Sequence, residues 1–176
     1  NKVKEWCDKM KITYHTVVKT NKRFKNSKST DLKIHSVIIA RLFKRMMNTG
    51  SANKYIPNIS YNANEDFIIG LLDGYFSGDG TVNKRDGYYV CSSASKKLII
   101  GISNCCSRLG IFGKISNHII KSNNIGSKNI KPVNTFSIRN DFAKIFAEKI
   151  KLTDENKMKR GEDILKRKYN TKYGRH

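Results

Sequence analysis

A chain of 176 residues with 38% hydrophobic and 10% aromatic content can bury a core, which excludes a disordered polycation and favours one compact domain. Its 35 lysines and arginines exceed its 14 acidic residues, so the net charge of +21 predicts a polyanionic partner, with nucleic acid as the first choice. No apolar run approaches the roughly 18 to 20 residues of a membrane span, and the four cysteines form neither a CxxC pair nor a disulfide framework, so we expect an intracellular protein.

The first part of the chain has a counterpart about one hundred residues later, which indicates an internal repeat. The run KITYH at 11–15 recurs as KISNH at 114–118, and five apolar positions further on also correspond. Residues 1–50 are therefore interpreted as the later half of a first copy, whose own beginning would lie upstream. The corresponding pairs are Leu32 and Phe136, Ile34 and Ile138, Ile38 and Phe142, Leu42 and Phe146, and Met46 and Ile150.

Residues 51–65 form a linker, and a complete second copy follows at 66–152. The order α-β-β-α-β-β-α predicts an α+β fold, and residues 153–176 are expected to form a basic C-terminal helix and tail. For the second copy we expect a helix over 66–77, a hairpin over 81–93 that turns at 84–87, a helix over 95–109 that stops at Gly110, strands over 112–121 and 133–138, and a helix over 140–150.

The helix over 66–77 carries glycines at a spacing of four residues. Gly70, Gly74 and Gly78 fall on one side of it, and each costs about 1 kcal/mol relative to alanine. We expect a compensating contact in which a second helix presses its backbone against this bare stripe. Asp79 follows at the helix end, with Gly80 suited to a left-handed cap. A buried helix with a small-residue face would explain the glycines alone, but the Asp-Gly pair favours a carboxylate delivered at the end of a helix pair.

The run LDGYFSGDG at 72–80 resembles the motif of the LAGLIDADG homing endonucleases, in the form that many inteins carry. In that family two such helices cross, and each ends in a metal-binding acid. The resemblance implies the family's fold, with a saddle of antiparallel sheet that binds DNA. It makes Asp79 the catalytic, metal-binding acid and the carbonyl of Gly78 a further ligand, with Mg²⁺ as cofactor. Ser77 replaces an earlier acid of the motif that does not hold the metal.

The segment KYIP at 54–57 lies where intein-type members carry a similar KxIP segment, so the resemblance makes Lys54 an active-site lysine. Its counterpart in the second copy falls at Lys157 or Lys159, of which we favour Lys157. A lysine near metal-bound carboxylates can polarise the attacking water or stabilise charge on the phosphate. In so basic a chain, the alternative for any single lysine is a solvated surface residue or a phosphate contact.

In this family the sheet of each copy lies along the major groove, so alternate strand residues face the bases and loops hold the phosphates. For any one of the residues given below, a position on a generic basic surface is as good an interpretation as a specific DNA contact. The candidates for DNA contact are Asn83, Arg85, Lys114, Ser116 and His118 in the second copy, and Lys11, Thr13, His15, Lys22 and Arg23 in the first.

The sequence contains one motif, so Asp79 supplies one acid, and the other would come from an upstream segment or a second subunit. Asp66 and Asp73, earlier on the same helix, are interpreted as cap or surface groups. The resemblance implies an intein- or intron-encoded enzyme that hydrolyses phosphodiester bonds in double-stranded DNA with Mg²⁺. The alternative is a protein that keeps this fold to bind nucleic acid without cutting it, such as an intron-splicing maturase.

Overall fold

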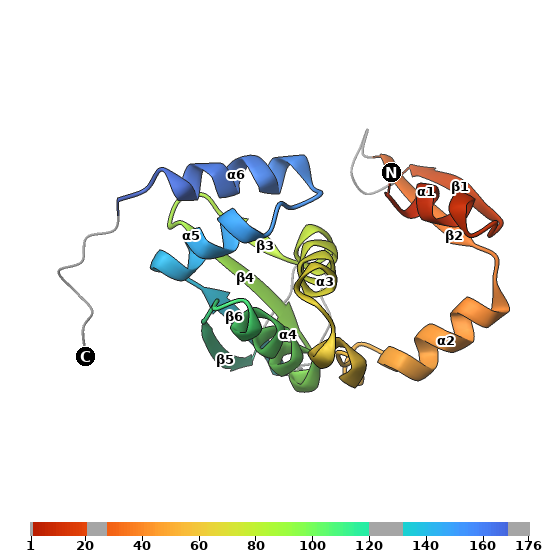
Figure 1. The fold of residues 1–176 in the computed structure, drawn as a ribbon, viewed down its shortest axis with the longest axis horizontal. Coiled ribbons are helices and arrows are strands. Elements are labelled where there is room, and N and C mark those ends of the chain that lie inside the picture. Colours follow the sequence, from red (N-terminus) through yellow and green to blue (C-terminus); the bar gives the residue numbers. More distant parts are fainter. Residues whose placement is uncertain (1, 21–27, 120–131, 169–176) are drawn as a thin grey trace. The chain divides into compact units, whose positions relative to one another are not determined.

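The computed structural model describes residues 2–20, 28–119 and 132–168, and the chain divides into two compact units, Asn1–Arg45 and Met46–His176. The first unit contains α1 (Lys2–Lys9) and an antiparallel hairpin of β1 (Tyr14–Thr20) and β2 (Lys28–Ile34), with Tyr14 opposite Ile34 (Figure 1). Helix α2 (Val37–Met47) begins in the first unit and ends in the second.

The second unit has the predicted order of elements, α-β-β-α-β-β-α, which confirms the α+β fold class. Each boundary lies within a few residues of the sequence prediction, because strong local patterns determine these elements. They are η1 (Asn58–Asn62), α3 (Glu65–Gly78), β3 (Thr81–Asn83), β4 (Tyr88–Ser93), α4 (Lys96–Arg108), β5 (Lys114–Ile119), β6 (Pro132–Ile138), α5 (Asn140–Lys149) and, after the repeat, α6 (Glu155–Leu165).

The four strands of the second unit form an antiparallel sheet in the order β3-β4-β6-β5. Along β4 and β6 every second side chain is buried, including Tyr89, Cys91, Phe136 and Ile138. Helices α4 and α5 cover this buried face (Figure 1). The opposite face is therefore free to carry polar side chains, as is usual for an antiparallel sheet with helices on one side.

Helix α3 is positioned by a cap at its start and by an apolar face along its length. The Asn64 side chain accepts a hydrogen bond of 3.0 Å from the Phe67 N–H, and this satisfies one of the free donors of the first turn. Ile68, Leu72 and Phe76 are buried, and the Phe76 ring packs against Phe146 with centroids 4.7 Å apart. The end of α3 is thus anchored on α5.

The end of α3 differs from the predicted left-handed cap at Gly80. Asp79 is the C-cap, in the right-handed helical region with φ −100°. Gly80 does not have a positive φ. Glycine is required for space, because a Cβ at residue 80 would lie 2.6 Å from Cδ1 of Phe76 and 2.7 Å from its main chain. The predicted stop at Gly110 is confirmed by its φ of +74°.

Of the two earlier acids of α3, Asp66 is exposed in the first turn, as interpreted from the sequence. The surface interpretation of Asp73 is wrong, because only 7% of this residue is exposed. Its carboxylate accepts hydrogen bonds of 2.6 Å from both the N–H and the hydroxyl of Thr153. The partner that buries Asp73 lies 80 residues away in the chain, where local sequence patterns give no sign of it.

Helices α2 and α5, which the predicted repeat makes equivalent, differ in how much of their apolar faces is buried. Phe146 of α5 is fully buried against Phe76 and Tyr89, with ring centroids 4.7 and 4.3 Å away. Its counterpart Leu42 in α2 is 51% exposed, and Ile38 is 80% exposed. The apolar face of α5 is covered by α3 and the β3-β4 hairpin, and the described residues of the first unit contain no such helix and hairpin before α1.

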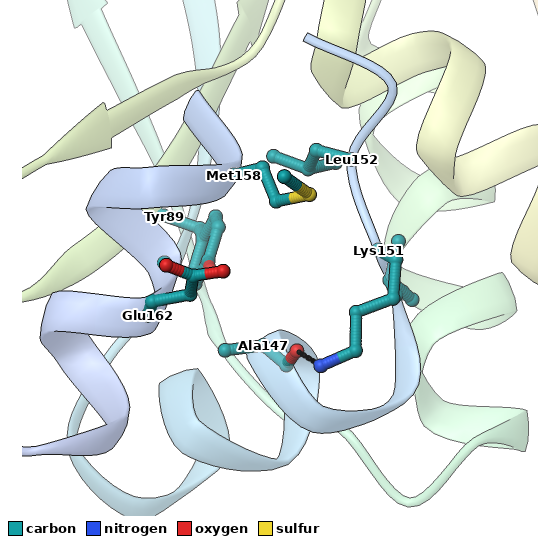
Figure 2. A pocket seen from close by; sticks show the side chains of 8 residues that line it. Tyr89, Ala147, Lys151, Leu152, Met158 and Glu162 are labelled. Carbon is teal, nitrogen blue, oxygen red and sulfur yellow. Dashed lines mark hydrogen bonds between the residues drawn. The ribbon is translucent and has the colours of Figure 1, made fainter. Parts of the chain in front are cut away.

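Helix α6 packs on α5 and on Tyr89 through Gly161, where a Cβ would lie 2.4 Å from the tyrosine hydroxyl oxygen. A cavity of about 80 Å³ lies beside this contact, and Figure 2 shows Tyr89, Met158 and Leu152 around it. It has room for a few water molecules but not for a substrate. None of the described helices is long and apolar enough to cross a bilayer.

Candidate functional site

Asp79 lies exposed at the C-terminal end of α3, where its N–H donates to the carbonyl oxygen of Tyr75 at 2.8 Å. Burial raises the pKa of the Tyr75 hydroxyl, and the charges of Cys91 and Asp79 raise it further. The tyrosine therefore stays protonated beside the acid. The rigid helix end holds the Asp79 carboxylate in solvent, where it can reach a ligand.

Lys157 of α6 reaches the same helix end. Its ammonium group donates to the carbonyl oxygens of Phe76, Ser77 and Gly78 at 3.0, 2.7 and 3.2 Å. These oxygens belong to the last turn of α3, at the negative end of the helix dipole, and that of Phe76 also accepts from the Gly80 N–H at 3.1 Å. The structure thus places Lys157, and not the exposed Lys159, next to the residue that precedes Asp79.

Lys54 lies elsewhere in the second unit. It is exposed, and its carbonyl oxygen accepts a hydrogen bond of 2.5 Å from the hydroxyl of Ser95 at the start of α4. Ile56, two residues later, is buried against Gly101 of α4. The hydrogen bonds of the described residues thus tie the KYIP segment to α4, and they bring Lys157 but not Lys54 to the end of α3.

The Asp79 carboxylate and the Gly78 carbonyl are oxygen donors of the kind that Mg²⁺ and similar cations prefer. They fit one side of a divalent metal site, although the Gly78 oxygen also accepts from Lys157. Across the described ranges, no three His, Cys, Asp or Glu side chains come together as a metal site.

The outer face of the four-stranded sheet carries many polar side chains. Lys114, Ser116 and His118 alternate along β5 and so share this face, with the Ser116 hydroxyl 3.0 Å from Nε2 of His118. Ser116 lies opposite Thr135 of β6, whose hydroxyl is 3.0 Å from that of Ser92 on β4. A row of short hydroxyl groups thus crosses three strands.

Sequence reasoning missed several residues of this face. The Arg139 guanidinium stacks over the ring of Tyr88, 4.1 Å from its centroid, at the edge of the surface. Thr135 and Ser137 could have been found from the period of two in β6, because Phe136 and Ile138 between them are plainly core residues. Tyr88 and Arg139 gave no such signal, since their contact joins β4 to the end of β6.

The predicted contacts Asn83 and Arg85 lie at the β3-β4 turn. Both polar atoms of the Asn83 side chain bind Asp86, accepting from its N–H at 2.9 Å and donating to its carboxylate at 3.2 Å. The Arg85 guanidinium lies 3.1 Å from the same carboxylate, and this contact is the largest reason why the pKa of Asp86 is lowered. Asn83 therefore shapes the turn, whereas the Arg85 side chain remains 89% exposed.

In the first unit, Lys11, Thr13 and His15 are all exposed. Lys11 follows α1 with φ +54°, so it ends the helix, whereas His15 lies on β1 with its ring stacked on that of His35 at 4.6 Å between centroids. His35 was not foreseen from the sequence. Lys22 and Arg23 lie outside the described residues.

Comparison with known proteins links this geometry to a family. A family model for the LAGLIDADG-like domain matches residues 66–151. Two relatives from Methanocaldococcus jannaschii are the "DNA-directed RNA polymerase subunit Rpo1C", 36% identical over 64% of this chain, and the "Probable translation initiation factor IF-2", 35% identical over 52%. A "DNA polymerase" from Thermococcus hydrothermalis is 34% identical over 46%. The chain spans only 13%, 8% and 6% of these three proteins.

The solved structures of similar fold include variants of the homing endonuclease I-DmoI, with a TM-score of 0.57 and 14% identity over 85% of this chain and 64% of that one. I-DmoI in complex with DNA and Mn has a TM-score of 0.55 and 16% identity, over 84% of this chain and 69% of that one. The sequence match and the shared fold agree: residues 66–151 match the LAGLIDADG-like domain, and the chain has a fold similar to that of the homing endonuclease I-DmoI.

Proposed function

We propose that this chain is part of a homing endonuclease that cleaves double-stranded DNA by hydrolysis of phosphodiester bonds, with Mg²⁺ as its divalent metal. The observation that carries the proposal is the pairing of an exposed acid with a lysine at one helix end, Asp79 and Lys157. The solved structures of I-DmoI with DNA and Mn, Ca or Mg support a divalent metal and a DNA partner for this chain as well.

Each site residue has a distinct role in the proposal. Asp79 and the Gly78 carbonyl would hold the metal, which when bound supplies a Lewis acid for the phosphate and for water. The Lys157 ammonium offers positive charge toward the scissile phosphate, and Lys54 is proposed to do the same at the site of the second acid. The hydroxyls and cations of the outer sheet face would contact base edges and phosphates.

The second acid is proposed to come from a partner helix, supplied by a segment that precedes residue 1 or by a second subunit. Around Gly70, Gly74 and Gly78, an added Cβ would meet nothing within 4 Å among the described residues. An exposed stripe without side chains lets another helix backbone approach closely. The exposed apolar face of α2 supports the same proposal, since its counterpart on α5 is covered by a motif helix and hairpin.

We also propose that the domain is encoded within an intein, with an intron as the alternative. The three relatives are named as different proteins: an RNA polymerase subunit, an initiation factor and a DNA polymerase. This chain matches only a small part of the length of each. A segment shared by proteins with such different activities does not carry the activity of any one of them. An insertion that moves between host genes explains this distribution.

The test is cleavage of a library of double-stranded DNA by the protein with any segment or subunit that accompanies it, in Mg²⁺. We expect discrete double-strand cuts, and we expect Asp79→Asn to lower the single-turnover rate by about 100-fold or more, because the metal loses a charged ligand. DNA affinity should stay within about threefold, because Asp79 is not part of the basic surface. Asp66→Asn is the matched control, since it removes an exposed carboxylate at the other end of α3.

Specific binding without cuts in Mg²⁺ or Mn²⁺ would contradict the nuclease. That result would identify a protein that binds nucleic acid with this fold, such as an intron-splicing maturase. If Asp79→Asn and the wild type cleave at the same single-turnover rate, Asp79 has no catalytic role.

A further inference from the structure

Asp73 is a buried carboxylate that the proposed chemistry does not use. It lies in α3, 7% exposed, and among its contacts it accepts hydrogen bonds of 2.8 Å from the hydroxyl of Ser77 and of 2.6 Å each from the N–H and hydroxyl of Thr153. Short hydrogen bonds to a carboxyl group are among the stronger contacts in a protein. They tie the segment before α6 to the last turns of α3.

This connection continues from Thr153 to Lys157. The next residue, Asp154, donates its N–H to the Ser77 hydroxyl at 3.2 Å and accepts from the Lys157 N–H at 2.8 Å as the N-cap of α6. One turn into α6, the Lys157 ammonium returns to the three carbonyls at the end of α3. The bonds therefore form a closed ring between the two helices, which we call the α3–α6 clamp: Asp73, Ser77, Thr153, Asp154 and Lys157.

We propose that Asp73 and Thr153 are positioning residues that hold the Lys157 ammonium at the end of α3, beside Asp79. The proposal rests on the proposed nuclease function for its consequence, which is that the clamp sets the cleavage rate. Four-carbon lysine side chains have much rotational freedom, and three carbonyls on an exposed helix end hold one weakly unless its own helix is fixed. The bonds from Asp73 to Thr153 fix where α6 begins and so where Lys157 lies.

The first measurement needs no cleavage. Lysines are acylated in the folded protein with a low concentration of reagent, and the rate at Lys157 is compared by mass spectrometry with that at Lys159, which is exposed on the same helix. We expect Lys157 to be protected in the wild type. In Thr153→Val, which keeps the shape but loses the hydroxyl donor, acylation of Lys157 should rise about tenfold, the effect of one hydrogen bond. Thr153→Ser keeps the hydroxyl and should restore protection.

The second measurement is single-turnover cleavage alongside DNA affinity. We expect Thr153→Val to slow cleavage by about tenfold with unchanged affinity, and Thr153→Ser to match the wild type. If Thr153→Val fails to fold by circular dichroism, Asp73→Asn is used in its place, because the amide keeps one acceptor oxygen. Equal acylation of Lys157 in wild type and variant overturns the proposal, as does increased acylation with an unchanged cleavage rate. A wild type that does not cleave contradicts the nuclease, while the acylation rates still decide whether the clamp positions Lys157.

Discussion

Burial is the largest influence on the pKa values of three cysteine thiols in the core of the second unit. It raises the pKa of Cys91 from 9.0 to about 12, and it also raises the pKa values of Cys105 and Cys106. Because the thiolate is the reactive form, these three residues should react with a thiol reagent at pH 8 only on unfolding. Labelling within seconds in the folded protein would contradict this burial.

The same shifts predict a pH dependence of stability. The unfolded chain releases its thiol protons near pH 9, whereas the folded chain holds that of Cys91 to about pH 12. The folded state therefore binds more protons in this window, and the free energy of unfolding falls as the pH rises through it. Urea unfolding at pH 8 and pH 10.5 measures the loss, and Cys91→Ala should flatten the dependence.

At the scale of single residues, sequence reasoning identified groups that a motif specifies and missed groups that a distant contact specifies. Asp79 lies at the end of its helix because the motif places it there. Asp73 lies one helical turn from Ile69 and from Phe76, on the apolar side of α3, and this spacing could have predicted its burial. Its hydrogen-bond partner Thr153 could not be found without the fold, because it lies 80 residues away in the chain. Gly80 and Gly101 are required by neighbours that no spacing reveals.

At the scale of elements, α3 has a side that is open in the described residues and a side that is packed. Gly74→Ala should raise the melting temperature, because alanine favours a helix by about 1 kcal/mol and its Cβ would meet nothing within 4 Å. The same Cβ should prevent close approach of a partner helix, so cleavage should fall about tenfold or more. Thermal unfolding by circular dichroism and the single-turnover rate measure the two effects.

Gly101→Ala in α4 is the contrasting variant. Its Cβ would lie 2.7 Å from Cγ1 of Ile56 and 2.8 Å from the Tyr61 hydroxyl oxygen, so we expect a loss of stability of about 1 to 3 kcal/mol. If the Gly74→Ala variant instead cleaves at the wild-type rate, the proposed pairing of α3 with a partner helix is ruled out.

Elements with strong local signals were predicted well from the sequence. The β3-β4 hairpin turns where Asp-Gly stands, and Gly87 has φ +68°. Helix α4 begins after Ser95, whose hydroxyl accepts from the Leu98 N–H at 3.2 Å. The order of strands in the sheet, with β6 between β4 and β5, could not be read from these patterns because it depends on pairing between distant segments.

At the scale of the whole molecule, the net charge of +21 should dominate DNA affinity. Each phosphate contact releases a counterion, so the logarithm of the binding constant should fall linearly with the logarithm of salt concentration. For about six to ten contacts, affinity should drop about 10³- to 10⁵-fold between 50 and 200 mM salt, as measured by fluorescence anisotropy. Lys114→Gln should lower the slope by about 1, and a salt-independent affinity would contradict this account.

The outer face of the sheet includes polar residues that are not part of the core. Along β4 and β6, outward residues such as Ser92, Thr135 and Ser137 alternate with core residues, so replacing them opens no cavity. Related domains can therefore diverge in the DNA they recognise while the interior of the sheet stays the same. For evolution, and for an engineer who wishes to alter what this surface binds, this face is therefore the part of the sheet that can change with little loss of stability.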